Sequence, residues 1–111
     1  MKFTTLIPRR RNDGSRVSKD EMNSIVTELQ NHFGGLTREG TVIGHWVDSA
    51  DGKVYVDESL KVCVACDNRR LEEARQFVTE IGRRLGQKAM FFEVQYYDGV
   101  QILEIDDKHD E

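Results

Sequence analysis

The chain has 111 residues, with 16 Lys and Arg against 20 Asp and Glu, a formal net charge of -4 and 38% hydrophobic residues. This length predicts one small domain with a single core, and the composition excludes a disordered chain. No apolar run approaches the ~18 residues that a membrane span needs and the N-terminus has no signal-peptide core, so we expect a cytoplasmic protein without a membrane partner. Two cysteines are too few for a disulfide framework, and the acidic balance argues against general nucleic-acid binding.

Hydrophobic periodicity and turn residues predict five strands and two helices. The strands are expected over residues 2–7, 41–48, 53–65, 88–97 and 100–105. The first helix is expected to begin at Ser18, which has the capping-box spacing to Glu21, and to end at Gly34-Gly35. The second helix is expected to begin at Asp67 or Asn68 and to end at Gly86.

The order βαββαβ plus a terminal strand predicts an α+β fold, a ferredoxin-like sandwich with two helices on one face of an antiparallel sheet. We expect the first and third strands to lie parallel at its centre. The single domain would span residues 1–105, and the acidic residues 106–111 would form a frayed tail. The helix-facing residues of the third strand are expected to be Val54, Val56, Leu60, Val62 and Val64.

A two-residue turn at Asp51-Gly52 would place His45 opposite Glu58, in an apolar row on the helix-covered face. A four-residue loop would change the partners and keep the faces, whereas a three-residue loop would reverse the faces. A buried His–Glu pair could transfer protons near neutral pH. The alternatives are a satisfied structural ion pair and a bulge that turns Glu58 outward.

The uncovered face of the sheet is expected to be rich in aromatic and apolar side chains, which favours an interaction site. Its residues are Trp46, Tyr55, Lys61, Cys63, Phe91, Gln95, Tyr97, Val100 and Ile102. A homodimer about a two-fold axis is the simplest partner. The residues expected in its interface are Trp46, Tyr55, Phe91 and Tyr97. An aromatic RNA platform is the alternative, but carboxylates on this face would repel phosphates.

A cationic loop ahead of the first helix favours a site for a small anion, because helix N-termini attract anions and arginine binds phosphate or carboxylate bidentately. Its residues are Arg9, Arg10, Arg11 and Arg16. The alternative is a solvated loop that balances nearby carboxylates. Trp46 and Gln87 are further candidate ligand-binding residues, and for Gln87 the alternative is backbone capping.

Cys63 and Cys66 form a C-x-x-C motif, which can serve metal or redox chemistry. Residues at this spacing on a strand point in opposite directions, and no second motif supplies further zinc ligands. We therefore expect two small buried apolar side chains here, and neither a metal nor a cofactor.

Several short motifs occur in a fixed order along most of the chain. They are Asp13-Gly14-x-x-Val17-Ser18, Phe33 with Gly35-Leu36-Thr37, Gly44-x-Trp46, Gly52 followed by Glu58-Ser59-Leu60-Lys61-Val62, and Gly86-Gln87. Over about residues 3–103 the pattern resembles a bacterial domain family of unknown function, made up of small ferredoxin-like proteins. Lys88 stands where members often have Glu. The resemblance implies the fold and a role for Trp46, Glu58 and Gln87, and it implies no activity.

These features together predict a non-catalytic, homo-oligomeric binding module for a small anion or a protein partner. The alternative function is a small-molecule enzyme that uses His45 and Glu58 as an acid–base pair, with Trp46 and Gln87 shaping the pocket.

Overall fold

The computed structural model describes residues 1–96 and 101–106 of the chain. Within them the chain forms four strands: β1 (Lys2–Pro8), β2 (Thr37–Val47), β3 (Val54–Ala65) and β4 (Phe92–Gln95). The helical elements are α1 (Lys19–Phe33), the short 3-10 turn η1 (Asn68–Arg70) and α2 (Leu71–Arg84). The fold is therefore α+β, as the sequence predicts.

The strands form one sheet in the order β2-β3-β1-β4, and all neighbouring strands are antiparallel. A four-stranded antiparallel sheet with two helices is compatible with the ferredoxin-like type. The prediction that the first and third strands lie parallel is wrong, since β1 runs antiparallel to β3 with Phe3 opposite Val64. The connection through α1 leaves β2 running in the direction of β1, and the following hairpin reverses β3.

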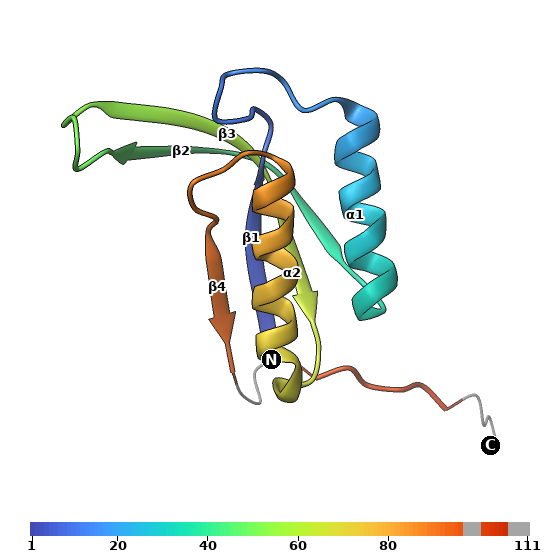
Figure 1. Ribbon diagram of the computed structural model, residues 1–111. Helices are drawn as coiled ribbons and strands as arrows, with labels where there is room; N and C mark the ends of the chain where they lie inside the picture. Colours follow the sequence, from blue (N-terminus) through green and yellow to red (C-terminus); the bar gives the residue numbers. More distant parts are fainter. Residues whose placement is uncertain (97–100, 107–111) are drawn as a thin grey trace.

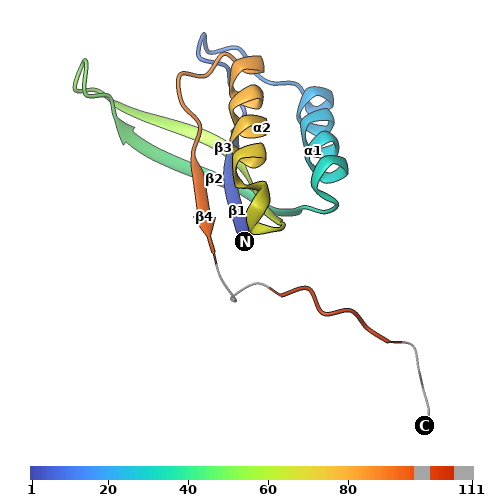
Figure 2. The same ribbon diagram turned by 60° about the horizontal axis from the view of Figure 1, so that its bottom comes forward.

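Helices α1 and α2 lie side by side on one face of the sheet (Figures 1 and 2). The core fills the space between them and the sheet, and its fully buried large side chains include Phe3, Ile7, Ile25, Leu29, Ile81, Leu85, Val62 and Val64. Phe3 also stacks on Phe92 of β4, with ring centroids 5.4 Å apart. The predicted helix-facing positions Leu60, Val62 and Val64 are confirmed, with exposed fractions of 4%, 0% and 1%.

Of the two hydrogen bonds of the predicted capping box at the start of α1, one is formed. The Ser18 hydroxyl accepts a hydrogen bond from the backbone N–H of Glu21 at 3.1 Å. The Glu21 carboxylate, however, pairs with Arg11. A cation is a stronger partner for a carboxylate than a backbone N–H, so the loop before α1 is held to its first turn by charge.

Beyond the helices, β2 and β3 continue as a two-stranded projection, here called the hairpin arm (residues 41–58) (Figures 1 and 2). The N–H of Asp48 donates to the carbonyl of Lys53 at 3.0 Å, which closes a four-residue loop. His45 therefore lies opposite Val56 and Ile43 opposite Glu58, so the predicted pairing of His45 with Glu58 is wrong. The faces are kept, as expected for a four-residue loop.

The predicted burial of Val54 and Val56 is also wrong. They lie on the same face as Val62 but are 63% and 58% exposed, because the helices do not extend over the hairpin arm. Strand alternation decides which way a side chain points, and a covering layer decides whether it is buried.

The C-terminal part differs most from the prediction. Strand β4 has four residues, so it is shorter than the predicted 88–97, and it pairs only with residues 2–5 of β1. Residues 101–106 are in no strand and extend away from the sheet, so the predicted additional strand is not formed there (Figure 1). The predicted strand ends at Tyr97 and Val100, the residues between them, and residues 107–111 lie outside the described residues. In the described part of the chain, neither helix has the length and apolar character required to cross a membrane.

Candidate anion-binding site

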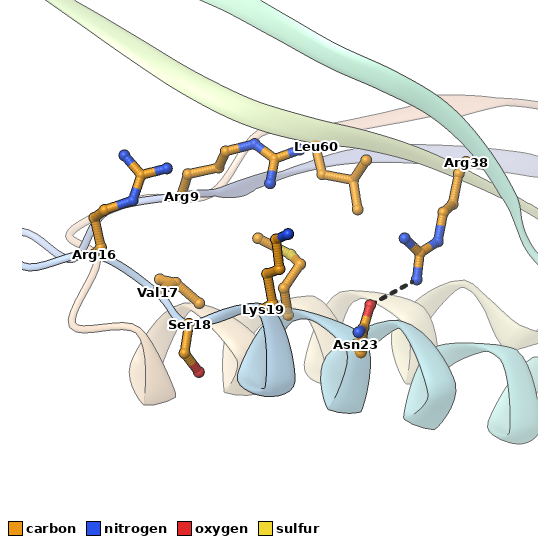
Figure 3. Close-up of a pocket in the computed structure, with 9 residues that line it drawn as sticks. Arg9, Arg16, Val17, Ser18, Lys19, Asn23, Arg38 and Leu60 are labelled. Atoms are coloured by element: carbon orange, nitrogen blue, oxygen red, sulfur yellow. Dashed lines mark hydrogen bonds between the residues drawn. The ribbon is translucent and has the colours of Figure 1, made fainter.

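A cavity of about 520 Å³ lies between the first turns of α1 and the sheet (Figure 3). The residues that line it are Arg9, Arg16, Val17, Ser18, Lys19, Met22, Asn23, Arg38 and Leu60. Three of them are buried apolar side chains: Val17, Met22 and Leu60. Four are cations, and none is a carboxylate, a histidine or a cysteine. The described lining can therefore hold negative charge.

Arg9 is positioned by backbone bonds on both sides. Its N–H donates to the carbonyl of Glu58 at 3.0 Å, and its carbonyl accepts from the N–H of Val17 at 2.8 Å. These two bonds join the end of β1 to β3 and to the entry of α1. The guanidinium of Arg9 then donates to the Thr41 hydroxyl at 2.8 Å.

Arg38 reaches the cavity from β2. It lies opposite Val62, a core residue, so its side chain points to the helix-covered side of the sheet. There the guanidinium donates to the Asn23 side-chain oxygen at 3.1 Å (Figure 3). A bulge between Arg38 and Thr41, with Gly40 at a φ of 88°, starts the hairpin arm directly after this residue.

The cavity gathers positive charge that has no ionic partner in the described part of the chain. Six of the ten arginines form ion pairs: Arg11, Arg69, Arg70, Arg75, Arg83 and Arg84. Three of the other four line the cavity: Arg9, Arg16 and Arg38. Lys19 is a fourth lining cation without a described ion pair. In a chain of net charge -4, this concentration of unpaired cations makes a local positive potential, which attracts anions.

The N-terminus of α1 adds to this potential. Ser18 is its N-cap, and the first backbone N–H groups of the helix carry partial positive charge. Asp20 and Glu21 in the first turn do not line the cavity, and Glu21 is engaged by Arg11.

Only part of the predicted cationic loop belongs to the cavity. Arg10 donates to the carbonyl of Gly14 at 3.0 Å, and Arg11 pairs with Glu21, so neither lines it. Lys19 and Arg38 also line the cavity and were not predicted. Lys19 directly follows the predicted N-cap, a position that could have been included. Arg38 was not recognised because the predicted strand starts at residue 41.

The other two predicted ligand-binding residues lie elsewhere. The amide of Gln87 donates to the carbonyls of Arg10 at 3.0 Å and Leu85 at 3.2 Å, so it caps the end of α2, the alternative that the sequence left open. Trp46 lies on the hairpin arm, where its indole N–H donates to Asp57 at 2.5 Å. Neither residue lines the cavity.

His45 and Glu58 are both exposed on the hairpin arm. Among the described residues, no hydrogen bond or ion pair joins them, and each lies opposite an apolar residue of the neighbouring strand. The direct pairing on which the acid–base hypothesis depends is therefore not formed.

Trp46, Tyr55 and Phe91, predicted for a dimer interface, are exposed by 47%, 38% and 50%. Trp46 and Tyr55 face each other across the arm and stack with ring centroids 5.0 Å apart. Tyr97 lies outside the described residues. An exposed aromatic pair is thus present on the hairpin arm.

Both cysteines are free. The buried Cys63 thiol donates to the Glu39 carboxylate at 2.7 Å and contacts the Thr4 hydroxyl at 3.3 Å. Burial, helped by the Glu39 carboxylate, raises the pKa of the Cys63 thiol, and burial raises the pKa of Cys66. The thiols are therefore protonated near neutral pH. Within residues 1–96 and 101–106, no group of three or more His, Cys, Asp or Glu is arranged to hold a metal ion.

No protein-family model matches the sequence, and no curated protein is significantly similar to it. The chemistry of the cavity and of the exposed surfaces is therefore the basis for a function.

Proposed function

We propose that this protein is a non-catalytic binding module that holds a small, multiply charged anion in the basic cavity. The observation that carries the proposal is the convergence on one cavity of Lys19 and three arginines. Among the residues that the structure describes, none of these arginines has an ionic partner and no carboxylate lines the cavity. Arginine binds phosphate or carboxylate oxygens through two parallel hydrogen bonds, so such a rim favours anions with several oxygens.

The volume of the cavity and its apolar lining residues narrow the ligand class. A volume of about 520 Å³ is within the range of small-molecule sites. The buried side chains of Val17, Met22 and Leu60 favour a ligand that places an apolar part against them. The best fit is a phosphate ester or a polycarboxylate with a compact apolar body.

The sequence order of the elements and the sheet order β2-β3-β1-β4 support a ferredoxin-like sandwich as the more specific description of the fold. Membership of the bacterial family whose motifs the sequence resembles is part of the same proposal. That family carries no known activity, so the cavity remains the basis for the function.

Calorimetric titration with pyrophosphate and with citrate tests the proposal. We expect saturable binding that weakens as salt is added, because exposed ionic contacts are screened. Arg38→Gln and Arg9→Gln should each weaken binding about tenfold or more, the usual contribution of a hydrogen bond to a charged group. Backbone amide shifts in NMR spectra should change around residues 16–23.

Arg10→Gln is the matched control, because it removes the same charge from the same loop at a residue that does not line the cavity. Its effect on affinity should be much smaller. The proposal fails if neither anion binds saturably at low salt, or if Arg10→Gln weakens binding as much as Arg38→Gln.

A further inference from the structure

The hairpin arm exposes apolar side chains on both of its faces. Ile43, Val47, Val54 and Val56 are 58–63% exposed on the face that continues the helix-covered side. Trp46 and Tyr55 are exposed on the opposite face. A two-stranded hairpin without a covering layer is marginally stable in water, and a contiguous exposed apolar patch usually marks an interaction site.

The segment of residues 101–106 has the same two-sided character. Ile102, Leu103 and Ile105 are exposed by 79%, 73% and 87%. In an extended strand, successive side chains point to opposite sides, so Ile102 would point to one side and Leu103 with Ile105 to the other. A strand of this segment beside β2 would therefore place apolar side chains next to apolar side chains on both faces.

Within one chain, the hairpin arm and residues 101–106 do not contact each other. In both views the hairpin arm and the segment extend from the molecule in opposite directions (Figures 1 and 2). A strand contact between the hairpin arm and this segment would therefore join two copies.

The edge strands of the sheet are β2 and β4. Strand β2 has eleven residues and its part in the arm, residues 41–47, contains no carboxylate, so Glu104 would meet no like charge there. Strand β4 has four residues and includes Glu93. Length and charge thus both favour β2 as the edge that receives the segment.

We propose that residues 101–106 of one copy pair as an added strand with the outer edge of β2 in a second copy, and that the second copy returns the same contact. The reciprocal exchange makes a closed two-fold dimer. Main-chain hydrogen bonds along the edge supply affinity, and the apolar side chains on both faces fix the segment in place.

Light scattering after size-exclusion chromatography of the full chain tests the proposal. The full chain should be a dimer, and a chain ending at Val100 should be a folded monomer, because residues 101–106 form no part of the core. Leu103→Lys should give a monomer, whereas Gln101→Lys adds the same charge at a polar position of the same segment and should leave the dimer largely intact.

Hydrogen exchange identifies the contact. Amides of β2 and of residues 101–106 should be protected together in the dimer, and the protection of β2 should be lost in the shortened chain. A monomeric full chain at the highest attainable concentration would overturn the proposal. A dimer that persists in the shortened chain would also overturn it, as would protection of residues 101–106 with β4 in a monomer.

Discussion

One strand, β3, passes through two different environments. Val62 and Val64 are 0% and 1% exposed, whereas Val54 and Val56, which alternate in the same way on the same face, are 63% and 58% exposed. The difference is the helix layer, which covers the end of the sheet near β1 and leaves the hairpin arm uncovered. The same residue type with the same alternation thus fills a core at one end and forms a surface at the other.

The two regions are also held together differently. In the covered half, stability comes from apolar packing between the sheet and two helices. In the hairpin arm, local polar and aromatic contacts replace it. Trp46 bonds to Asp57 and stacks on Tyr55, whose hydroxyl donates to Asp51 at 2.6 Å. Contacts of this kind, exposed to water, contribute less per residue than burial does.

The largest difference between the regions is expected for the matched pair Val62→Ala and Val54→Ala. Val62→Ala should lower the free energy of unfolding by about 2 kcal/mol, since it removes two buried methyl groups and leaves a cavity. Val54→Ala should change it by less than about 0.5 kcal/mol, as is usual at an exposed position. Urea denaturation of the chain ending at Val100, which lacks the segment of the proposed dimer contact, measures both. Similar costs for the two variants would contradict the contrast between the regions.

A smaller, pH-dependent effect is expected where the two helices meet. Arg70 and His32 both bond to Glu73, and the Arg70 guanidinium is the main reason that the pKa of Glu73 falls from 4.5 to about 2. A carboxylate with a lowered pKa in the folded state adds stability above pH 4.5, and that contribution disappears as the pH falls toward 2. Glu73→Gln should therefore be less stable than the unmodified protein near neutral pH, by a difference that shrinks below pH 4.5.

Denaturant unfolding at a series of pH values measures this difference. Glu72→Gln is the control, because Glu72 is on the same turn of α2 and its one ion pair among the described residues is with the exposed Arg75. The interpretation fails if the stability difference for Glu73→Gln stays constant between neutral pH and pH 2.

The contrast between the two regions also separates what could be predicted from sequence. The Ser18 cap, the helix end at Gly34 and the burial of Val62 depend on neighbours in sequence or on strand alternation, and they were predicted correctly. The register of the hairpin arm depends on whether its loop has two or four residues. The dipeptide Asp51-Gly52 is compatible with both loop lengths, so the register could not be predicted from it.

The cavity was predicted only at its loop. Arg9 and Arg16 shortly precede α1 in sequence, so they could be predicted as anion ligands from their position before the N-terminus of a helix. Arg38 reaches the same cavity through the pairing of β2 with β3, on the far side of a bulge. The position of Arg38 depends on the register between β2 and β3 and on the start of β2 at residue 37. No local pattern in the sequence encodes either of these.

The smallest effect is expected within the hairpin arm, at the bond between Tyr55 and Asp51. That bond raises the pKa of Tyr55 above 10.0, chiefly because the phenol donates its proton to the carboxylate. A group whose pKa is raised by folding adds stability below its ordinary pKa, and the contribution is lost as the pH rises through the folded-state value. Asp51→Asn should therefore return the pKa of Tyr55 toward 10.0 and lower stability slightly at neutral pH.

Ultraviolet absorbance of tyrosinate during alkaline titration measures this shift, and Tyr55→Phe assigns the signal among the three tyrosines. Asp57→Asn is the matched control, because it removes an equal charge from the same arm. The Asp57 carboxylate accepts a hydrogen bond from Trp46 and has no bond to Tyr55 among the described residues. Asp57→Asn should change tryptophan fluorescence and leave the Tyr55 titration nearly unchanged. If Asp57→Asn moved the pKa of Tyr55 as much as Asp51→Asn does, the summed negative charge of the arm would set this pKa. The hydrogen bond between Tyr55 and Asp51 would then not be the cause of the shift.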